Sequence, residues 1–275
     1  MKIGYIAANL QLVKRNKQWL QAPYTSRLHK AKFYSDIVVS YSRLLSQRRK
    51  SITYLGKKFE YDNTATPLNL QSYPFEVGQW ILGNMDKKPS TVLDIGANIG
   101  QFGCTIASIL PGTKVDSFEP NPDVFDMLKT NAVYYPNLRA YNFGLSPASV
   151  DQMYYEPTRS AVGSMFEENA GTIGKLKKVS ISTVDDPSKK TKRKKYDLIK
   201  IDVEGYEYSV LDCLKNISTK YLYIELSGEA RKKDYTHAAM FRKIEQTFGP
   251  FDICYASGHG RFDPTLDTLL KFTDQ

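Results

Sequence analysis

Hydrophobic positions divide the chain into two parts with different periods. Between residues 29 and 50 the apolar side chains recur at steps of three and four residues, which is the period of a helix with one apolar face. This pattern predicts that residues 1–58 form a helical extension. A further apolar stretch predicts a second helix around Phe75 to Met85.

From Thr91 onward, short apolar and β-branched runs alternate with helical patterns. The strands that this alternation predicts lie at 91–95, 114–119, 138–143, 196–202, 221–226 and 251–256. Near-continuous apolar strands separated by helices are typical of a parallel sheet covered on both faces. We therefore expect an α/β domain over 59–275, and we interpret 265–272 as an added antiparallel edge strand.

The segment 147–195 interrupts this alternation. It has no obvious helical pattern, but 150–155 and 178–184 alternate as strands do, and it ends in the basic tract KKTKRKK at 189–195. An insertion of this length in a doubly wound sheet is typical of a functional segment or a protruding hairpin. The basic tract itself could be a solvated loop.

Positive charge is concentrated at the start of the chain. The net charge is +9, yet residues 1–58 hold thirteen Lys and Arg against one acid, giving +12, while 59–275 hold twenty-five against twenty-eight, giving −3. Such asymmetry indicates an arm that contacts an anionic partner, although a solvated helix would show it too.

Three features bear on the compartment. The three cysteines, Cys104, Cys213 and Cys254, are widely spaced and form neither a disulfide framework nor a zinc motif, which favours a reducing cytoplasm. No apolar run reaches the roughly 18 residues of a transmembrane helix, and the start does not look like a signal peptide. We expect a cytoplasmic protein and leave open a peripheral contact with the inner membrane face through residues 1–58.

The most informative residues are TVLDIGANIGQFG at 91–103. A predicted buried strand carries Asp94 near its end, and a loop with Gly96 and Gly100 leads into a helix, so the backbone can pass close to a ligand. Asp94 stands where the dinucleotide fingerprint has its first glycine. A carboxylate there favours a cationic ligand, such as S-adenosylmethionine (SAM), over a pyrophosphate. Nineteen residues past Gly100, Glu119 closes the next strand and can accept hydrogen bonds from ribose hydroxyls.

These segments together resemble one family. DIGANIGQFG, SFEPNPDVFDMLKTN, NFGLS and above all LIKIDVEGYEYSVL are similar to the FkbM-type methyltransferases, over roughly residues 60–230. The resemblance implies a SAM-dependent O-methyltransferase with the Rossmann-like class I fold, whose seven-stranded sheet has the order 3-2-1-4-5-7-6.

The resemblance also implies a cofactor site. Asp94, Gly96 and Gly100 would surround the methionine moiety, Glu119 would bind the ribose, and Asn142 with Gly144 would lie on the adenine side. Neighbouring loop residues complete the expected cofactor-binding set: Ala97, Asn98, Pro120 and Asn121.

Carboxylates at two further strand ends point to the chemistry. Asp202 and Glu204 follow the fourth strand and Glu225 closes the fifth, so they can converge beside the cofactor. One of them could be the general base that a hydroxyl acceptor needs, or Asp202 and Glu225 could hold a divalent cation such as Mg²⁺. Lys200 should face the same side as Asp202 and form an ion pair with it or with Glu225. His237 follows the fifth strand and could reach the acceptor.

The favoured function is O-methylation of a sugar, glycolipid or natural product, whose acceptor or carrier could be anionic or lipid-linked. The first alternative is a nucleic-acid methyltransferase in which residues 1–58 and 189–195 contact phosphates, although the sequence has no Asn/Asp-Pro-Pro-Tyr base-flipping signature. The second alternative is a SAM-binding module without catalysis, against which the intact carboxylates argue weakly.

Overall fold

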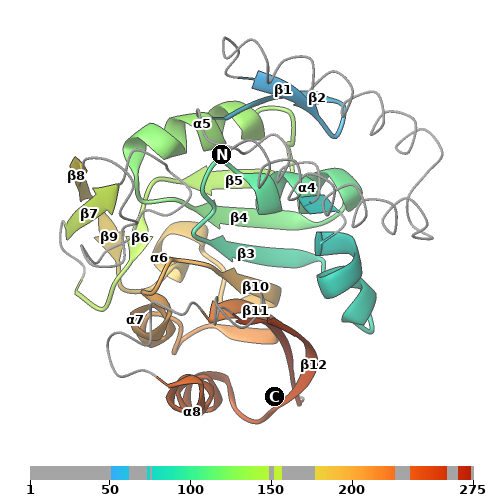
Figure 1. The fold of residues 1–275 in the computed structure, drawn as a ribbon, viewed down its shortest axis with the longest axis vertical. Helices are drawn as coiled ribbons and strands as arrows, with labels where there is room; N and C mark the ends of the chain where they lie inside the picture. The colour runs from blue at the N-terminus through green and yellow to red at the C-terminus, as the bar shows by residue number, and fades with distance from the viewer. Residues whose placement is uncertain are drawn as a thin grey trace, which may run out of the picture.

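A seven-stranded sheet is the centre of the molecule in the computed structural model (Figure 1). The structure describes residues 51–61, 73–74, 76–148, 152–156, 177–226, 236–258 and 266–273, so the predicted helix at 29–50 and most of the basic arm lie outside the described residues. The strands of the sheet are β3 (Thr91–Ile95), β4 (Lys114–Phe118), β5 (Leu138–Tyr141), β10 (Lys195–Ile201), β11 (Ser218–Leu226), β12 (Phe251–Gly258) and β13 (Leu266–Phe272).

The order of these strands confirms the predicted fold class. Neighbours in the sheet run β12-β13-β11-β10-β3-β4-β5, which is 3-2-1-4-5-7-6 when the strands are counted along the chain. All pairs from β5 to β11 are parallel. The fold is therefore the Rossmann-like arrangement of class I methyltransferases.

Helices cover the sheet on both faces, as the apolar runs of the strands require. On one face α4 (Gln101–Ile109) and α5 (Pro122–Ala132) pack on a cluster that includes Leu198. On the other, α7 (Glu207–Asp212) and α8 (His237–Phe248) pack on a cluster that includes Ile199. Successive residues of a strand point to opposite faces, and Leu198 and Ile199 of β10 are both fully buried, so both faces of this strand are covered.

The final strand differs from its prediction in position. It is antiparallel to both neighbours, as expected, but it lies between β11 and β12 and not at the edge of the sheet. Leu270 pairs with Leu222 on one side and with Ile253 on the other, and both Leu269 and Leu270 are fully buried. An apolar strand of this kind is more stable inside the sheet, where its backbone groups are paired on both sides.

The described end of the predicted helical extension is a β-hairpin, so the helix predicted for 1–58 is wrong over 51–58. Strands β1 (Ser51–Tyr54) and β2 (Lys57–Glu60) are joined by Leu55 and Gly56, which both have positive φ, as a two-residue hairpin turn requires. Ile52, Tyr54 and Phe59 are buried in the same cluster as α4. The hairpin therefore belongs to the sheet domain, and the boundary predicted at residue 58 falls inside that domain.

The remaining elements largely follow the sequence pattern. The helix expected at 75–85 is present as a π-helical turn, η1 (Val77–Ile81), followed by a 3₁₀ turn, η2 (Leu82–Asn84). The interrupting segment contributes β7 (Gln152–Glu156), β8 (Lys177–Ile181), β9 (Thr183–Val184) and the short α6 (Ser188–Thr191). Strand β9 pairs with β6 (Gly144–Leu145), which precedes the segment. Because β7 and β8 are antiparallel, the expectation of a hairpin is confirmed. No helix among the described residues is long and apolar enough to cross a membrane.

Candidate active site

The glycine loop after β3 is closed tightly against the end of β10. The Gly96 N–H donates to the Phe118 carbonyl, and the Asp202 N–H donates to the Ile95 carbonyl. Gly96 has φ +77°, and a Cβ on it would lie 1.8 Å from the Asp202 carbonyl oxygen. Only glycine fits there, so the loop that the sequence singled out can pack directly against the end of β10.

A pocket with an empty volume of about 950 Å³ opens along the carboxyl ends of the central strands. The predicted site residues that line it are Gly96, Ala97, Asn98, Glu119, Pro120, Gly144, Asp202 and Glu204. The other predicted residues do not line it, and most of them support residues that do.

Asp94 is one of these supporting residues. Its side chain is fully buried, accepts a hydrogen bond from the Ser117 hydroxyl at 2.9 Å, and lies 3.6 Å from the Lys200 ammonium. Burial raises the pKa of Asp94, and Lys200 and Ser117 oppose that rise. The carboxylate lies behind the loop and not in the pocket wall, so its predicted contact with a methionine ammonium stays a prediction.

Gly100, Asn121 and Asn142 also act from behind the pocket. Gly100 precedes α4 with φ +94°, and a Cβ there would meet the Leu128 side chain at 2.8 Å. The Asn121 side chain accepts a hydrogen bond from the Asp123 N–H and so caps α5. The Asn142 amide donates to the carbonyls of Glu119 and Pro120, which fixes the loop after β4.

Glu119 fits the ribose-binding role expected of it. Its carboxylate lines the pocket, is only 5% exposed, and accepts one backbone N–H on each oxygen, from Asn98 and Asn121, both at 2.9 Å. Each oxygen keeps a lone pair for a further donor. Burial raises the pKa of Glu119 to about 7, and the two N–H donors limit that rise. With an adjoining apolar wall that includes Phe143 and Leu145, these residues fit a nucleoside.

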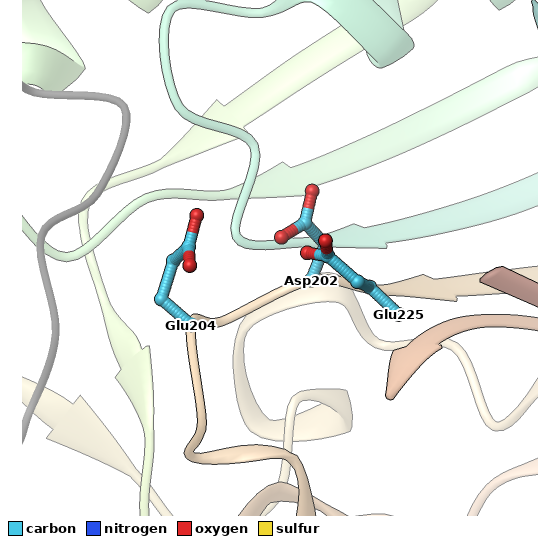
Figure 2. Close-up of side chains that lie close together, drawn as sticks. All are labelled: Asp202, Glu204 and Glu225. Atoms are coloured by element: carbon cyan, nitrogen blue, oxygen red, sulfur yellow. The ribbon is translucent and has the colours of Figure 1, made fainter. Parts of the chain in front are cut away.

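Three carboxylates converge at one end of the pocket, as predicted (Figure 2). Asp202, Glu204 and Glu225 each offer an oxygen, and these oxygens all lie within 4.8 Å of one another. Lys200 lies beside them, 3.3 Å from Asp202, and donates to the Gly96 carbonyl at 2.7 Å. The predicted ion pair of Lys200 with Asp202 is therefore present. The three carboxylates are also the described residues that could hold a divalent cation.

The charges in this cluster are strongly coupled. Repulsion from Asp202, burial and a hydrogen bond raise the pKa of Glu225 to about 12. Burial also acts to raise the pKa of Asp202, but Lys200 and the bond from Glu225 hold it below its usual range. The two acids therefore titrate as a pair, and the opposite directions of their pKa shifts favour one proton shared in the hydrogen bond between them, with Lys200 beside Asp202.

Two other residues of the site were not found from the sequence. Glu207 is fully buried at the start of α7, and its carboxylate accepts from the N–H groups of Gly205, at 3.0 Å, and Val203, at 3.4 Å. These groups flank Glu204, whose positive φ of 51° needs such support. Tyr73 lines the pocket from a segment before the first sheet strand, and the nearby Asp202 adds to the effect of burial in raising its pKa.

His237 is not brought into the pocket. It is the first residue of α8, directly after the capping residue Thr236, and it is not among the described residues that line the pocket. Its catalytic role stays a prediction.

Two curated relatives of this chain are methyltransferases. The hexuronic acid methyltransferase AglP of Haloferax volcanii is 32% identical over 146 residues, covering 52% of this chain and 58% of AglP. The methyltransferase sdnD of Sordaria araneosa is 28% identical over 163 residues, covering 47% of this chain and 62% of sdnD. The chain thus spans less than two thirds of the length of these relatives.

Solved structures show weaker similarity. Fibrillarin from Aeropyrum pernix, with natively bound SAM, is 14% identical with a TM-score of 0.42, covering 71% of this chain and 74% of fibrillarin. The N-terminal domain of EvdMO1, with SAH and D-fucose, is 7% identical with a TM-score of 0.46, covering 92% of this chain and 100% of that domain. The fold class is given by the strand order itself.

The match to a family model covers all of the site residues that the sequence predicted. The methyltransferase FkbM domain matches residues 94–249, which is more than half of the chain and runs from Asp94 through Glu119, Asp202 and Glu225. The chain therefore belongs to the FkbM family of SAM-dependent methyltransferases.

Proposed function

We propose that this chain methylates a hydroxyl oxygen of a sugar or a sugar-like small molecule, with Asp202 as the general base. The observation that carries the proposal is the placement of Asp202. Its carboxylate stands in the pocket wall at the end of a central strand, and Lys200 and Glu225 keep it ionised. A hydroxyl needs such a proton acceptor because an alcohol is a poor nucleophile at neutral pH.

Each residue of the site has a separate role in this reaction. When bound, SAM supplies an electron-poor methyl carbon and a sulfur that leaves with the bonding electron pair. Asp202 takes the proton of the acceptor hydroxyl as the new C–O bond forms. Lys200 balances the charge of Asp202, and Glu225 keeps its own proton in the hydrogen bond between the two acids. Glu119 and the glycine loop fix the orientation of the reacting groups, which is a large part of catalysis of this kind.

The acceptor class rests on two supports. AglP, which matches half of this chain, is a hexuronic acid methyltransferase, so a saccharide is the preferred acceptor. The wall beside Asp202 also carries Glu204, and carboxylates accept hydrogen bonds from hydroxyl groups. The reacting end of the acceptor should therefore be a neutral hydroxyl. A negative charge or a lipid carrier would be tolerated only on a part of the acceptor that lies away from these acids.

A divalent cation is the alternative role for the same cluster. Mg²⁺ takes oxygen ligands, and Asp202, Glu204 and Glu225 would supply them. Bound there, the ion would lower the pKa of the acceptor hydroxyl, and the proton on Glu225 would have to leave first. The Lys200 ammonium already occupies one side of Asp202, which favours the metal-free arrangement.

The test is Asp202→Asn in the full chain. SAM affinity, measured by calorimetry, should be nearly unchanged, while turnover with labelled SAM and a panel of neutral hexosides and hexuronic acids should fall about a hundredfold or more. Asp252→Asn, an exposed acid on β12, is the matched control and should leave both unchanged. Normal turnover of Asp202→Asn would make Asp202 structural. Loss of turnover with EDTA and its recovery with Mg²⁺ would instead establish the metal role.

A further inference from the structure

The amino ends of the parallel strands carry a surface that methyl transfer does not use. It lies at the opposite edge of the sheet from the pocket. Exposed or half-exposed basic side chains gather there on the hairpin and at the starts of β4, β5 and β10. We call these residues the basic edge: Lys57, Lys114, Arg139, Arg193, Lys194 and Lys195.

Two acids lie among these residues, Asp116 and Asp197, and both already have hydrogen-bond partners. Asp116 is 3% exposed and accepts hydrogen bonds from the Tyr196 hydroxyl at 3.0 Å and from Arg193 Nε at 3.4 Å. One face of the Arg193 guanidinium is thus engaged, while its terminal NH₂ groups remain available for another acceptor. The exposed charges of Lys114 and Arg139 remain in excess.

A groove runs through the middle of the basic edge. It has an empty volume of about 850 Å³, and Lys114, Arg139 and Arg193 are among its lining residues. Between them lie small or turn-forming residues such as Gly112 and Pro136, which leave room for a headgroup. Three cationic side chains around one recess favour a phosphate group.

Two exposed apolar side chains come just before Pro136, a lining residue of this groove, along the chain. Val133 is 72% exposed and Tyr134 is 41% exposed, and they follow one another in the connection from α5 to β5. The Lys57 ammonium lies 5.9 Å from the centre of the Tyr134 ring. At a bilayer surface, apolar and aromatic side chains insert below the headgroups while lysines contact the charged headgroups. Val133, Tyr134 and the neighbouring Lys57 have the side chains that this arrangement needs.

We propose that the basic edge, with Val133 and Tyr134, docks the protein on an anionic phospholipid surface, with a lipid phosphate in the groove. A nucleic acid would satisfy the basic groups but would leave Val133 in water, so the pair of apolar side chains favours the membrane. The strong positive charge of residues 1–58 has the sign that such a surface also attracts. In this orientation the pocket, at the other edge of the sheet, stays open to its substrates.

Vesicle binding of the full chain tests the proposal without any methyl acceptor. Cosedimentation with vesicles of 70% phosphatidylcholine and 30% phosphatidylglycerol should exceed that with phosphatidylcholine alone. Each Lys or Arg near an anionic surface contributes about fivefold, so Lys114→Gln/Arg139→Gln should weaken binding by roughly 20-fold. Arg139→Gln should weaken it by about fivefold, and the matched change Arg242→Gln, on the exposed side of α8, should not.

The apolar pair has a readout of its own. Val133→Ser/Tyr134→Ser should weaken binding without a change in charge. In the Tyr134→Trp variant, tryptophan fluorescence should shift to shorter wavelength when anionic vesicles are added. This shift should be larger than that of the wild type, which has two tryptophans. Unchanged SAM affinity and melting temperature would show that each variant folds. Equal binding by the Arg139 and Arg242 variants, an unshifted Trp emission, or binding to duplex RNA with none to the vesicles would each overturn the proposal.

Discussion

The two edges of the sheet are built from the same strands but differ in the sign and the burial of their charged side chains. At the carboxyl ends, Asp94, Glu119 and Glu207 are buried and held by hydrogen bonds from the backbone or from Ser117. At the amino ends, Lys114 and Arg139 are exposed to solvent. Burial shifts the pKa of each of these acids. We call the carboxyl ends with Asp94, Glu119 and Glu207 the acidic edge. Its charged groups are buried and have shifted pKa values, whereas Lys114 and Arg139 of the basic edge are exposed.

The difference has a structural cause. Loops at the carboxyl ends pass close to one another, as Gly96 does against Asp202, and so exclude water from their acids. The connections at the amino ends, such as that from Val133 to the start of β5, lie open on the surface. A substitution that disrupts this close approach at the carboxyl ends should therefore have the largest effect on stability and SAM binding.

Gly96→Ala is the substitution that breaks the acidic edge. Its Cβ would lie 1.8 Å from the Asp202 carbonyl oxygen, and the φ of +77° is unfavourable for alanine. We expect the free energy of unfolding to fall by more than about 4 kcal/mol, or SAM binding to be lost with the loop displaced. Urea unfolding and calorimetry measure both.

Gly112→Ala is the matched control at the basic edge. A Cβ on Gly112 would meet nothing within 4 Å. The free energy of unfolding of the Gly112→Ala protein should stay within about 0.5 kcal/mol of the wild type, as is usual for a surface change. A Gly96→Ala protein as stable as this control, with normal SAM affinity, would show that the loop can move apart without cost.

The sequence predicts the fold well where a property is local. The strands β3 and β10 are mostly apolar at their centres, and their alternation with helical patterns predicts a parallel sheet. The hairpin at 51–60 was missed because its alternation covers only four residues on each side of a turn and follows a strong helical pattern. The interior place of β13 depends on pairing with β11 across forty residues, which no local pattern contains.

The same reasoning explains the site. Glu119 and Asp202 stand at strand ends inside recognisable motifs, so their positions could be predicted. Glu207 lies inside one of those motifs, but its burial depends on how α7 packs and not on its neighbours in sequence. Tyr73 comes from a distant segment outside the family match.

Glu207 gives the stability of the protein a pH dependence. Burial raises its pKa from 4.5 to about 7, so the folded protein keeps a proton that the unfolded chain releases. The stability from this proton is present below about pH 4.5 and is lost as the pH rises through 7. The unfolding free energy of the wild type minus that of Glu207→Gln should fall by on the order of 3 kcal/mol across this range. A difference that is flat or rises with pH would contradict this.

Glu119→Ala should weaken SAM binding by about 1.5–3 kcal/mol, the range for hydrogen bonds to a charged group. The loss reflects the two lone pairs that the carboxylate directs into the pocket and the anchoring of the Asn98 and Asn121 N–H groups. Titration calorimetry at pH 8, where Glu119 is ionised, gives the cleanest comparison. Equal affinities of wild type and variant would remove Glu119 from the ribose site.

The smallest expected effect tests whether the two edges are independent. A strand of five residues separates them by about 16 Å, which is twice the screening length of about 8 Å at physiological salt. Even in water without salt, one charge at that distance changes the energy of the cationic cofactor by only about 0.3 kcal/mol. Arg139→Gln should therefore leave SAM affinity unchanged at 0.15 M salt and raise it slightly at 0.01 M, where the screening length is about 30 Å. A threefold change at physiological salt would show that Arg139 is coupled to the pocket through the structure, with Tyr141 at the end of β5 as the nearest route.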